Sequence, residues 1–432
     1  MISRLSPAIF ALLLCIATSA RAETIHWING RWFDGDTFVE RVFYSAEGRL
    51  TAAGPETIDR TVDLAGQFVV PAFGDAHHHG IDSADGLGAK IDQFLREGIY
   101  YVKNPNVIPD RLTGDVRGRI NNKTSIDVAF ANGGLTASGG HPVRLHAMLA
   151  SRRVFGDLTP QDMENRAYFI IDDKQDLAAK WPKIAAGRPD FIKTFLLFSE
   201  EFEKRRGDPA AGFKGLDPKI LRAIVRRAHR DGLRVTAHVE TAFDFAQAVK
   251  AGVDEIAHLP IPRADFSPDL SAYVIDKAAA RRAAERGIVV VATVSALARM
   301  GGRGMTEEQV LAARANQKAN LKTLADAGVK IAVGSDGISG EPVLATASHE
   351  ADYLHEHGFF DARSLLRMWT EITAATIFPE RRIGRLAEGY EADFLVLAEN
   401  PLVDFVNVRK IVLRVKQGEP FSLSDASSND GE

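Results

Sequence analysis

Three consecutive histidines, His77, His78 and His79, are the residues of this chain whose type and spacing most clearly suggest chemistry. They follow the apolar run 68–73, which is typical of a β-strand. In an extended segment alternate side chains share a side, so His77 and His79 face one way and His78 faces the other. Two imidazoles about 7 Å apart along a strand can bind one metal ion. The triplet therefore suggests a metal site with His78 packed behind it.

Four further polar residues stand at the ends of other apolar runs. Lys193, His238 and His258 close runs that resemble strands, and Asp336 follows another one. A lysine or aspartate in such a place costs free energy unless it is paired or bound to a metal. Each also has an ordinary alternative: a salt bridge for Lys193, a hydrogen-bonded core histidine for His238 or His258. A helix N-cap is the alternative for Asp336, but the joint occurrence favours one shared site.

The elements that must position these residues are predicted from the apolar pattern. Helical stretches at 220–231, 242–251 and 316–327 each stop before a glycine, a common C-terminal signal. Strands alternating with helices over roughly 260 residues predict an α/β fold, specifically a (β/α)8 TIM barrel. An open doubly wound sheet is the alternative, although no G-x-G-x-x-G follows an early strand. The predicted barrel strands are 68–73, 99–102, 126–131, 191–196, 234–238, 255–258, 288–294 and 331–334.

The candidate residues fall where a barrel places its chemistry. Functional side chains in such barrels lie at the carboxyl ends of the strands. The candidates follow the first, fourth, fifth, sixth and eighth predicted strands: His77 and His79, Lys193, His238, His258, and Asp336. The pattern therefore predicts that residues far apart in the chain meet at one end of the barrel.

The two ends of the chain share a pattern of short apolar runs and turn signals. We expect residues 23–66 and 381–421 to pair into one small β-sandwich, with the barrel at 67–380 between them. Residues 422–432 are rich in Ser, Asp, Asn and Gly, which predicts a disordered tail.

Residues 1–22 have the pattern of a secretory signal peptide. Arg4 precedes an apolar stretch at 8–17, and an A-x-A motif ends at Ala22, where we expect cleavage. The stretch is too short to span a bilayer, so no stable membrane anchor is expected. A lipoprotein anchored on Cys15 is a weaker alternative. The expected location is the periplasm or the extracellular medium.

Composition limits the possible partners and ligands. An apolar content of 45% with 25% charged residues is typical of a soluble globular protein. The net charge of −4, without a basic run, predicts no nucleic-acid partner. The only cysteine, Cys15, lies in the predicted signal peptide, so a metal must be bound by His, carboxylate or modified Lys. The sequence leaves the oligomeric state open, and a homo-oligomer is compatible with it.

The chain resembles the amidohydrolase superfamily in residues spread over nearly all of its length after residue 22. The resemblance is carried by VPAFGDAHHH at 70–79, by Lys193, His238 and His258, by GSD at 334–336, and by the stretch 383–397. It is specific for the superfamily and not for a substrate. It implies a metal-dependent (β/α)8 barrel beside a β-sandwich built from both chain ends, in agreement with the predicted elements.

The resemblance also implies a binuclear metal centre. One ion would be bound by His77, His79 and Asp336, and the other by His238 and His258. Lys193, carboxylated by CO2 to N6-carboxylysine, would bridge both, since an ammonium only donates whereas the carboxylated form offers two anionic oxygens. With His and oxygen ligands, two zinc ions are favoured, and Mn, Co or Ni are alternatives.

The implied reaction is hydrolysis of a small-molecule substrate. A hydroxide bridged by both metals would attack a carbonyl, and Asp336 would carry the proton to the leaving group. Gly139 and Gly140 let the backbone approach a ligand closely. Several peptide- and lactam-cleaving members look similar here, so His141 is predicted to contact the substrate; a histidine that fixes a turn is the alternative. His146 is predicted to be structural.

An amide C–N bond is the favoured target, in a dipeptide, an N-acyl amino acid or a cyclic amide, as in an imidazolonepropionase-like or prolidase-like branch. Lactone, ester or phosphoester hydrolysis on the same site is the alternative. Lys193 argues against a deaminase, because mononuclear deaminases of the superfamily generally lack the bridging lysine. A non-catalytic scaffold is disfavoured because all six ligand positions are filled.

Overall fold

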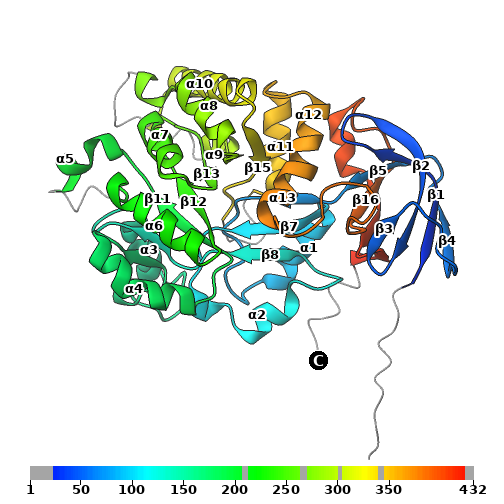
Figure 1. Cartoon of the computed structure of the whole chain (residues 1–432), viewed down its shortest axis with the longest axis horizontal. Helices are drawn as coiled ribbons and strands as arrows, with labels where there is room; N and C mark the ends of the chain where they lie inside the picture. Colours follow the sequence, from blue (N-terminus) through cyan, green and yellow to red (C-terminus); the bar gives the residue numbers. More distant parts are fainter. Residues whose placement is uncertain (1–22, 207–212, 263–269, 300–303, 339–344, 424–432) are drawn as a thin grey trace, which may run out of the picture.

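The computed structural model describes residues 23–206, 213–262, 270–299, 304–338 and 345–423. The predicted signal peptide and nearly all of the predicted tail at 422–432 lie outside these residues. In the described middle of the chain, parallel strands alternate with helices, and a separate sheet lies to one side of them (Figure 1). No described helix combines the length and the apolar character needed to cross a membrane.

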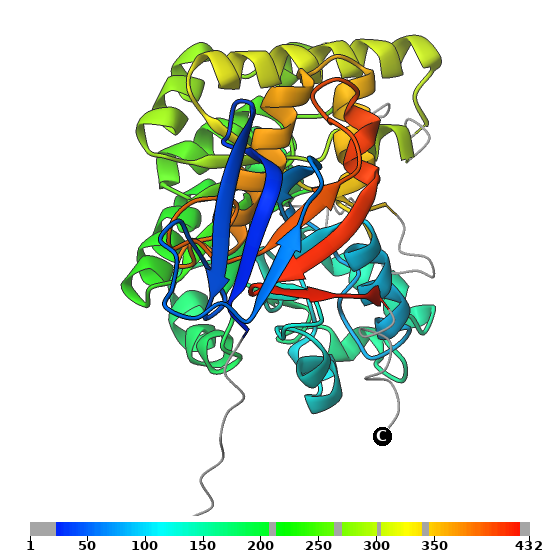
Figure 2. The ribbon, with the colours of Figure 1, turned by 90° about the vertical axis from the view of Figure 1, so that its right-hand side faces the viewer.

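The separate sheet is built from both ends of the chain, whose strands lie side by side in Figure 2, and we call it the end sheet. Its order is β18-β17-β16-β5-β1-β2-β3, with β4 beside β1. The two ends meet where β16 runs antiparallel to β5, with Leu395 opposite Val70. The strands are β1 (Ile25–Phe33), β2 (Phe38–Ala46), β3 (Arg49–Thr51), β4 (Arg60–Asp63), β5 (Phe68–Pro71), β16 (Phe394–Leu397), β17 (Ile411–Lys416) and β18 (Glu419–Phe421).

The prediction that residues 68–73 form one barrel strand is wrong, because the structure divides them between two strands. Its first part is β5 in the end sheet, and its last residue begins β6 (Phe73–Asp75), which pairs with a different sheet. The exchange occurs between Ala72, whose amide donates to Asp393, and Phe73, whose amide donates to Gly98. Both parts are buried, so the apolar pattern does not mark the point where the partner changes.

The remaining strands form two parallel sheets, of order β10-β9-β11-β12-β13-β14-β15 and β6-β7-β8. Backbone hydrogen bonds connect them in two places. Ala76 donates to Val333 (3.0 Å), with bonds from Asp336 to His77 and from His79 to Gly337 (2.8 Å each) close by, and Asp190, just before β11, donates to Phe130 (2.9 Å). The strands are β7 (Ile99–Asn104), β8 (Asp127–Phe130), β9 (Gly134–Thr136), β10 (Tyr168–Ile170), β11 (Phe191–Phe195), β12 (Arg234–His238), β13 (Glu255–Ala257), β14 (Val289–Ala292) and β15 (Lys330–Val333). The sequence pattern missed β9 and β10, which are three residues long each.

Helices surround the parallel strands (Figure 1). Several begin with side-chain caps: at α6, for example, Asp217 accepts from the amide of Lys219, and at α7 Thr241 forms a capping box with Asp244. The longest helix begins at Glu307, so the predicted helix 316–327 covers only its second half. The main helices are α1 (Leu87–Arg96), α2 (Gly114–Arg119), α3 (Val143–Ser151), α4 (Lys174–Ala186), α5 (Phe202–Arg206), α6 (Pro218–Arg230), α7 (Ala242–Ala251), α8 (Lys277–Glu285), α9 (Ser295–Arg299), α10 (Glu307–Asp326), α11 (Ala347–Glu356), α12 (Ala362–Arg367) and α13 (Thr373–Ile377).

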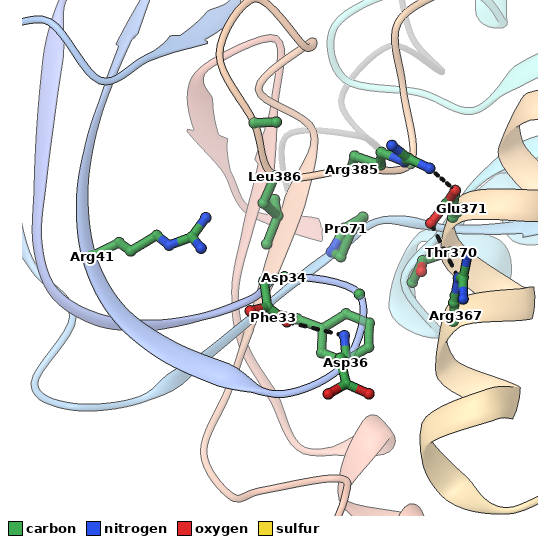
Figure 3. A pocket seen from close by; sticks show the side chains of 13 residues that line it. Phe33, Asp34, Asp36, Arg41, Pro71, Arg367, Thr370, Glu371, Arg385 and Leu386 are labelled. Carbon is green, nitrogen blue, oxygen red and sulfur yellow. Dashed lines mark hydrogen bonds and ion pairs between the residues drawn. The ribbon is translucent and has the colours of Figure 1, made fainter.

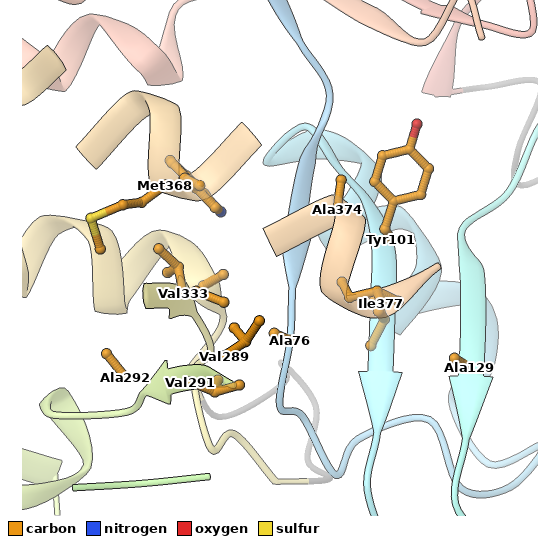
Figure 4. Packing of buried hydrophobic residues seen from close by; sticks show 14 of the residues in the cluster. Ala76, Tyr101, Ala129, Val289, Val291, Ala292, Val333, Met368, Ala374 and Ile377 are labelled. Atoms are coloured by element: carbon orange, nitrogen blue, oxygen red, sulfur yellow. The ribbon is translucent and has the colours of Figure 1, made fainter. Parts of the chain in front are cut away.

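The core between strands and helices holds the strand ends in place. Figure 4 shows Val289, Val291 and Val333 grouped beside Ala76, where β14, β15 and the turn after β6 meet. Each valine side chain contributes about 1.5–3 kcal/mol when fully buried. This packing brings the turn after β6 next to the turn after β15, and these two turns carry the histidine triplet and Asp336.

Candidate metal centre

The histidine triplet lies in the turn that follows β6. The rings of His77 and His79 lie 5.2 Å apart between centroids. His78 points elsewhere: its Nδ1 lies 3.0 Å from Ser335 Oγ, and its ring packs edge-on against Phe94. The alternation expected of an extended segment is therefore present, and only His77 and His79 share a side.

Asp336 closes a three-residue group with these two histidines. Its Oδ1 lies 3.6 Å from His77 Nε2 and 3.5 Å from His79 Nε2. The three ligand atoms lie within 4.8 Å of one another, which makes this a group of described residues able to hold a metal ion. Donors of a tetrahedral zinc ion lie about 3.3 Å apart, given Zn–N bonds of about 2.0 Å. The geometry therefore fits a cation with little rearrangement.

The approach of Asp336 to His77 depends on Gly334. A Cβ at Gly334 would lie 2.6 Å from Val291 Cγ1 and 2.9 Å from His77 Cβ, so no larger residue fits here without a shift. Asp336 and His258 both adopt left-handed backbone conformations, with φ of 49° and 74°. Asp and His are among the residues that tolerate this region, and it is enriched at functional sites.

Two further imidazoles adjoin the group. His238 ends β12, and His258 follows β13. Their ring centroids lie 4.5 Å apart, and that of His258 lies 4.7 Å from that of His77. Nδ1 of His258 lies 2.8 Å from Thr293 Oγ1, which leaves Nε2 of this ring for another partner. The parallel sheet thus places a second pair of nitrogen ligands beside the first group.

Lys193 lies in the middle of β11 and not at the strand end where it was predicted, because the apolar run continues beyond it to Phe195; it is only 2% exposed. Its Nζ has no hydrogen-bond partner among the described residues, and neither do the two ring nitrogens of His77. Burial lowers the pKa of Lys193 to about 7, although Asp336 and Glu255 act in the opposite direction. Buried polar atoms without partners are rare because they cost free energy. These atoms therefore fit a place where a cation or a modified lysine completes the bonding.

Electrostatics put the other ligands in the protonation state that a metal needs. Burial lowers the pKa values of His77, His238 and His258, which keeps these rings neutral. Burial alone would raise the pKa of Asp336, but His258, His79 and Lys193 together lower it below its usual range. Neutral imidazoles and an ionised carboxylate are the forms that bind divalent metals.

His141 lies at the edge of this cluster. Its ring centroid is 5.6 Å from that of His238 and 5.3 Å from that of Phe195. Its backbone amide donates to the carbonyl of Lys214, which anchors the loop. The structure thus places His141 beside a predicted ligand, and its contact with a substrate stays a prediction.

The sequence reasoning missed polar residues that hold the ligands. Thr293 contacts His258, and Glu240 Oε2 lies 3.3 Å from His238 Nε2. Both stand in the turns directly after strands β14 and β12, which is the signal that could have identified them. Lys103 and Glu255 were also not recognised as a buried ion pair, with Nζ and Oε2 2.8 Å apart.

A cavity of about 490 Å³ lies elsewhere, between the end sheet, α12 with the π-helical segment Met368–Ile372 that follows it, and residues 384–387 (Figure 3). Its lining is charged, but Glu371 forms ion pairs with both Arg385 and Arg367. None of the predicted ligands lines it. We place the candidate site at the histidine cluster, where Nζ of Lys193 and both ring nitrogens of His77 are buried without a hydrogen-bond partner among the described residues.

The chain matches the model of the Amidohydrolase family over residues 119–418, well over half of its length. It belongs to this family, as the resemblance in the sequence predicted. The matched range includes Lys193, His238, His258 and Asp336 and begins after the histidine triplet.

Individual relatives agree with this membership. The ochratoxinase of Aspergillus niger is 29% identical over 204 residues, which are 46% of this chain and 39% of that protein. The match thus spans about two fifths of the length of the curated relatives. The crystal structure of A. niger ochratoxinase has a TM-score of 0.71 at 19% identity and covers 93% of this chain and 96% of its own. That of a prolidase complexed with N-methylphosphonate-L-proline has a TM-score of 0.67 at 22% identity and covers 92% and 99%. These solved structures share the fold of this chain.

Proposed function

We propose that this protein is a metal-dependent hydrolase that cleaves an amide C–N bond in a small molecule. The observation that carries the proposal is the meeting of His77, His79 and Asp336 with their ligand atoms within 4.8 Å of one another. Membership of the amidohydrolase family and relatives named as ochratoxinase and prolidase support the choice of an amide bond. A dipeptide, an N-acyl amino acid or a cyclic amide is the proposed substrate class.

The proposed architecture is a (β/α)8 barrel at about 67–380 beside a small β-sandwich from residues 23–66 and 381–421. The hydrogen bonds from Ala76 to Val333 and from Asp190 to Phe130 support a barrel, because they connect both outer strands of the smaller parallel sheet, β6 and β8, to the larger one. One strand within the proposed barrel range belongs to the end sheet instead: β5 (68–71) pairs with β1 and β16.

The proposed centre binds two divalent cations, with zinc favoured. His77, His79 and Asp336 would hold one ion, and His238 and His258 the other. Lys193 would bridge them as N6-carboxylysine: its neutral amine adds to CO2 and releases one proton. The unpartnered Nζ of Lys193 supports this assignment. When bound, such cations lower the pKa of a coordinated water and polarise a carbonyl.

Side chains of this protein would then direct the reaction. Asp336, which is ionised, can accept a proton and return it to the leaving nitrogen. His141, beside His238, would contact the substrate carbonyl. Phe195 is buried, with its ring centroid 5.3 Å from that of His141 and 5.4 Å from Nζ of Lys193, and would keep water away from the lysine.

A substrate panel tests the proposed function. Metal-loaded protein is offered dipeptides, N-acyl amino acids, cyclic amides, lactones and phosphoesters, and hydrolysis is followed by mass spectrometry. We expect turnover of at least one amide class. Turnover of lactones together with failure on every amide class would overturn the assignment of a C–N bond.

We also propose that the protein is exported to the periplasm or beyond, on the signal-peptide pattern of residues 1–22. N-terminal sequencing of protein recovered from the periplasmic fraction of a Gram-negative host should begin at Glu23. An uncleaved chain in the cytoplasmic fraction would contradict export.

A further inference from the structure

Glu240 is a buried carboxylate beside a predicted metal ligand and has no part in the reaction described above. It follows β12, two residues after His238, and is 2% exposed. Its Oε2 lies 3.3 Å from Nε2 of His238. An imidazole that donates from Nε2 to a carboxylate keeps its lone pair on Nδ1. The contact therefore selects which nitrogen of His238 is offered to a cation.

The position of Glu240 is fixed by its surroundings. Its backbone amide donates to Oδ2 of Asp244 (3.2 Å), and its carbonyl accepts from the amide of Ile261 (3.2 Å). Asp244 is fully buried and also accepts from the amides of Phe198 (3.0 Å) and Ser199 (2.9 Å). Glu240 is thus held by the turns that follow β11, β12 and β13. Lys193 lies in β11, His238 ends β12, and His258 follows β13.

The ring of His238 is confined on other sides as well. The ring of His141 lies at 5.6 Å with an interplanar angle of 30°, and that of His258 at 4.5 Å with an angle of 66°. His258 is oriented in the opposite sense, because Thr293 contacts its Nδ1. The two neighbouring imidazoles therefore present different nitrogens, Nδ1 from His238 and Nε2 from His258.

We propose that Glu240 is a positioning residue for the second cation: it orients His238 so that Nδ1 faces the metal centre, and it raises the basicity of that nitrogen. The proposal rests on the proposed function, because it requires a cation at His238 and His258. Carboxylates that hydrogen-bond metal-binding histidines typically change metal affinity 10–100-fold. The effect should fall on the second cation, since the histidine that Glu240 contacts, His238, is a ligand proposed for that ion.

The test compares stepwise Zn²⁺ affinities of the metal-free, full-length protein by titration against a chelating indicator. Wild type should bind two ions. In Glu240→Gln and Glu240→Ala the second affinity should fall about 10–100-fold, more in the alanine variant, with the first affinity unchanged. Glu200→Gln is the matched control: Glu200 lies nearby and contacts Thr241 rather than a histidine, so both affinities should stay as in wild type.

A second measurement makes the outcomes distinct. The absorption spectrum of the Co²⁺-loaded protein reports ligand geometry, and only the band of the second ion should change in Glu240→Gln. Thermal unfolding of the metal-free variants checks folding; if the alanine variant unfolds, the isosteric glutamine variant provides the test. An unchanged second affinity, or an equal loss at both sites, would overturn the role of Glu240. If wild type itself binds no Zn²⁺, the proposed function fails instead.

Discussion

Asp75 and Ser335 are joined by a 3.0 Å hydrogen bond from the backbone amide of Ser335 to Oδ1 of Asp75, although they are 260 positions apart. The same carboxylate accepts from the amides of His77 (3.2 Å) and Ala347 (2.9 Å). It therefore connects the turn after β6 with the turn after β15. These are the turns that carry His77, His79 and Asp336, so one buried carboxylate sets the spacing of the three-residue metal group.

Replacing Asp75 with alanine should therefore weaken both folding and metal binding. Three buried amides would lose their acceptor, and each unsatisfied group costs about 1–3 kcal/mol. We expect a clear fall in the unfolding free energy, measured with denaturant, and weaker binding of the first Zn²⁺. Asp36→Ala, at an exposed position, is the control and should change neither. Wild-type zinc affinity in Asp75→Ala would contradict the role of Asp75 in spacing the ligands.

Removing the amine of Lys193 should remove the bridge between the cations. We expect Lys193→Ala to fold, to bind fewer than two metal ions per chain and to lose most activity, measured by metal analysis and turnover. Lys180→Ala, which breaks an exposed ion pair with Glu164, should keep both. Normal metal content and turnover in Lys193→Ala would rule out the binuclear centre.

Asp336→Asn should separate proton transfer from folding. The amide keeps the size of the side chain but cannot take up a proton, so we expect the turnover number to fall about 10²–10⁴-fold. Because Asp336 is also a proposed metal ligand, folding is compared without metal: circular dichroism and the melting temperature of the metal-free variant should stay close to those of metal-free wild type. A variant with undiminished turnover would show that another group carries the proton.

Removal of metal should lower stability and abolish turnover. A ligand that binds only the folded state stabilises it by RT ln(1 + [L]/Kd), which is about 2.7 kcal/mol at one hundred times Kd. We expect dialysis against a chelator to lower the melting temperature and Zn²⁺, Mn²⁺, Co²⁺ or Ni²⁺ to restore it. A melting temperature that does not respond to any of these ions would argue against a metal centre.

His146 should make the folded protein sensitive to acid. Burial lowers its pKa from 6.5 to about 4, against the hydrogen bond to the Pro142 carbonyl. Between these two values the unfolded chain binds a proton that the folded chain does not, so stability is lost as the pH falls from 6.5 to 4. Denaturant unfolding of wild type and His146→Gln across this range should give a shallower loss in the variant. His229→Gln, at the surface, should follow wild type, and parallel curves for all three proteins would refute the contribution of His146.

Much of the fold and of the candidate site was predictable because it depends on local sequence. Apolar runs ended by polar residues identified strands β7, β8 and β11–β15, and alternation along an extended segment separated His78 from His77 and His79. The break between β5 and β6 was not predictable, because a buried strand looks the same whichever sheet accepts its hydrogen bonds. The contact of Glu240 with His238 was also missed, since a charged residue in a turn has no periodicity.

The sequence by itself determined the set of ligand-type residues and, except for Lys193 in the middle of β11, their places at or just after strand ends, since both follow from residue type and from the two-residue period of a strand. Only the tertiary structure decided which of them meet. Asp336 reaches His77 because Gly334 leaves room beside Val291, and because a hydrogen bond to Asp75 joins the turn after β15 to the turn after β6. Such distances depend on packing between segments hundreds of residues apart, where no local pattern reports the partner.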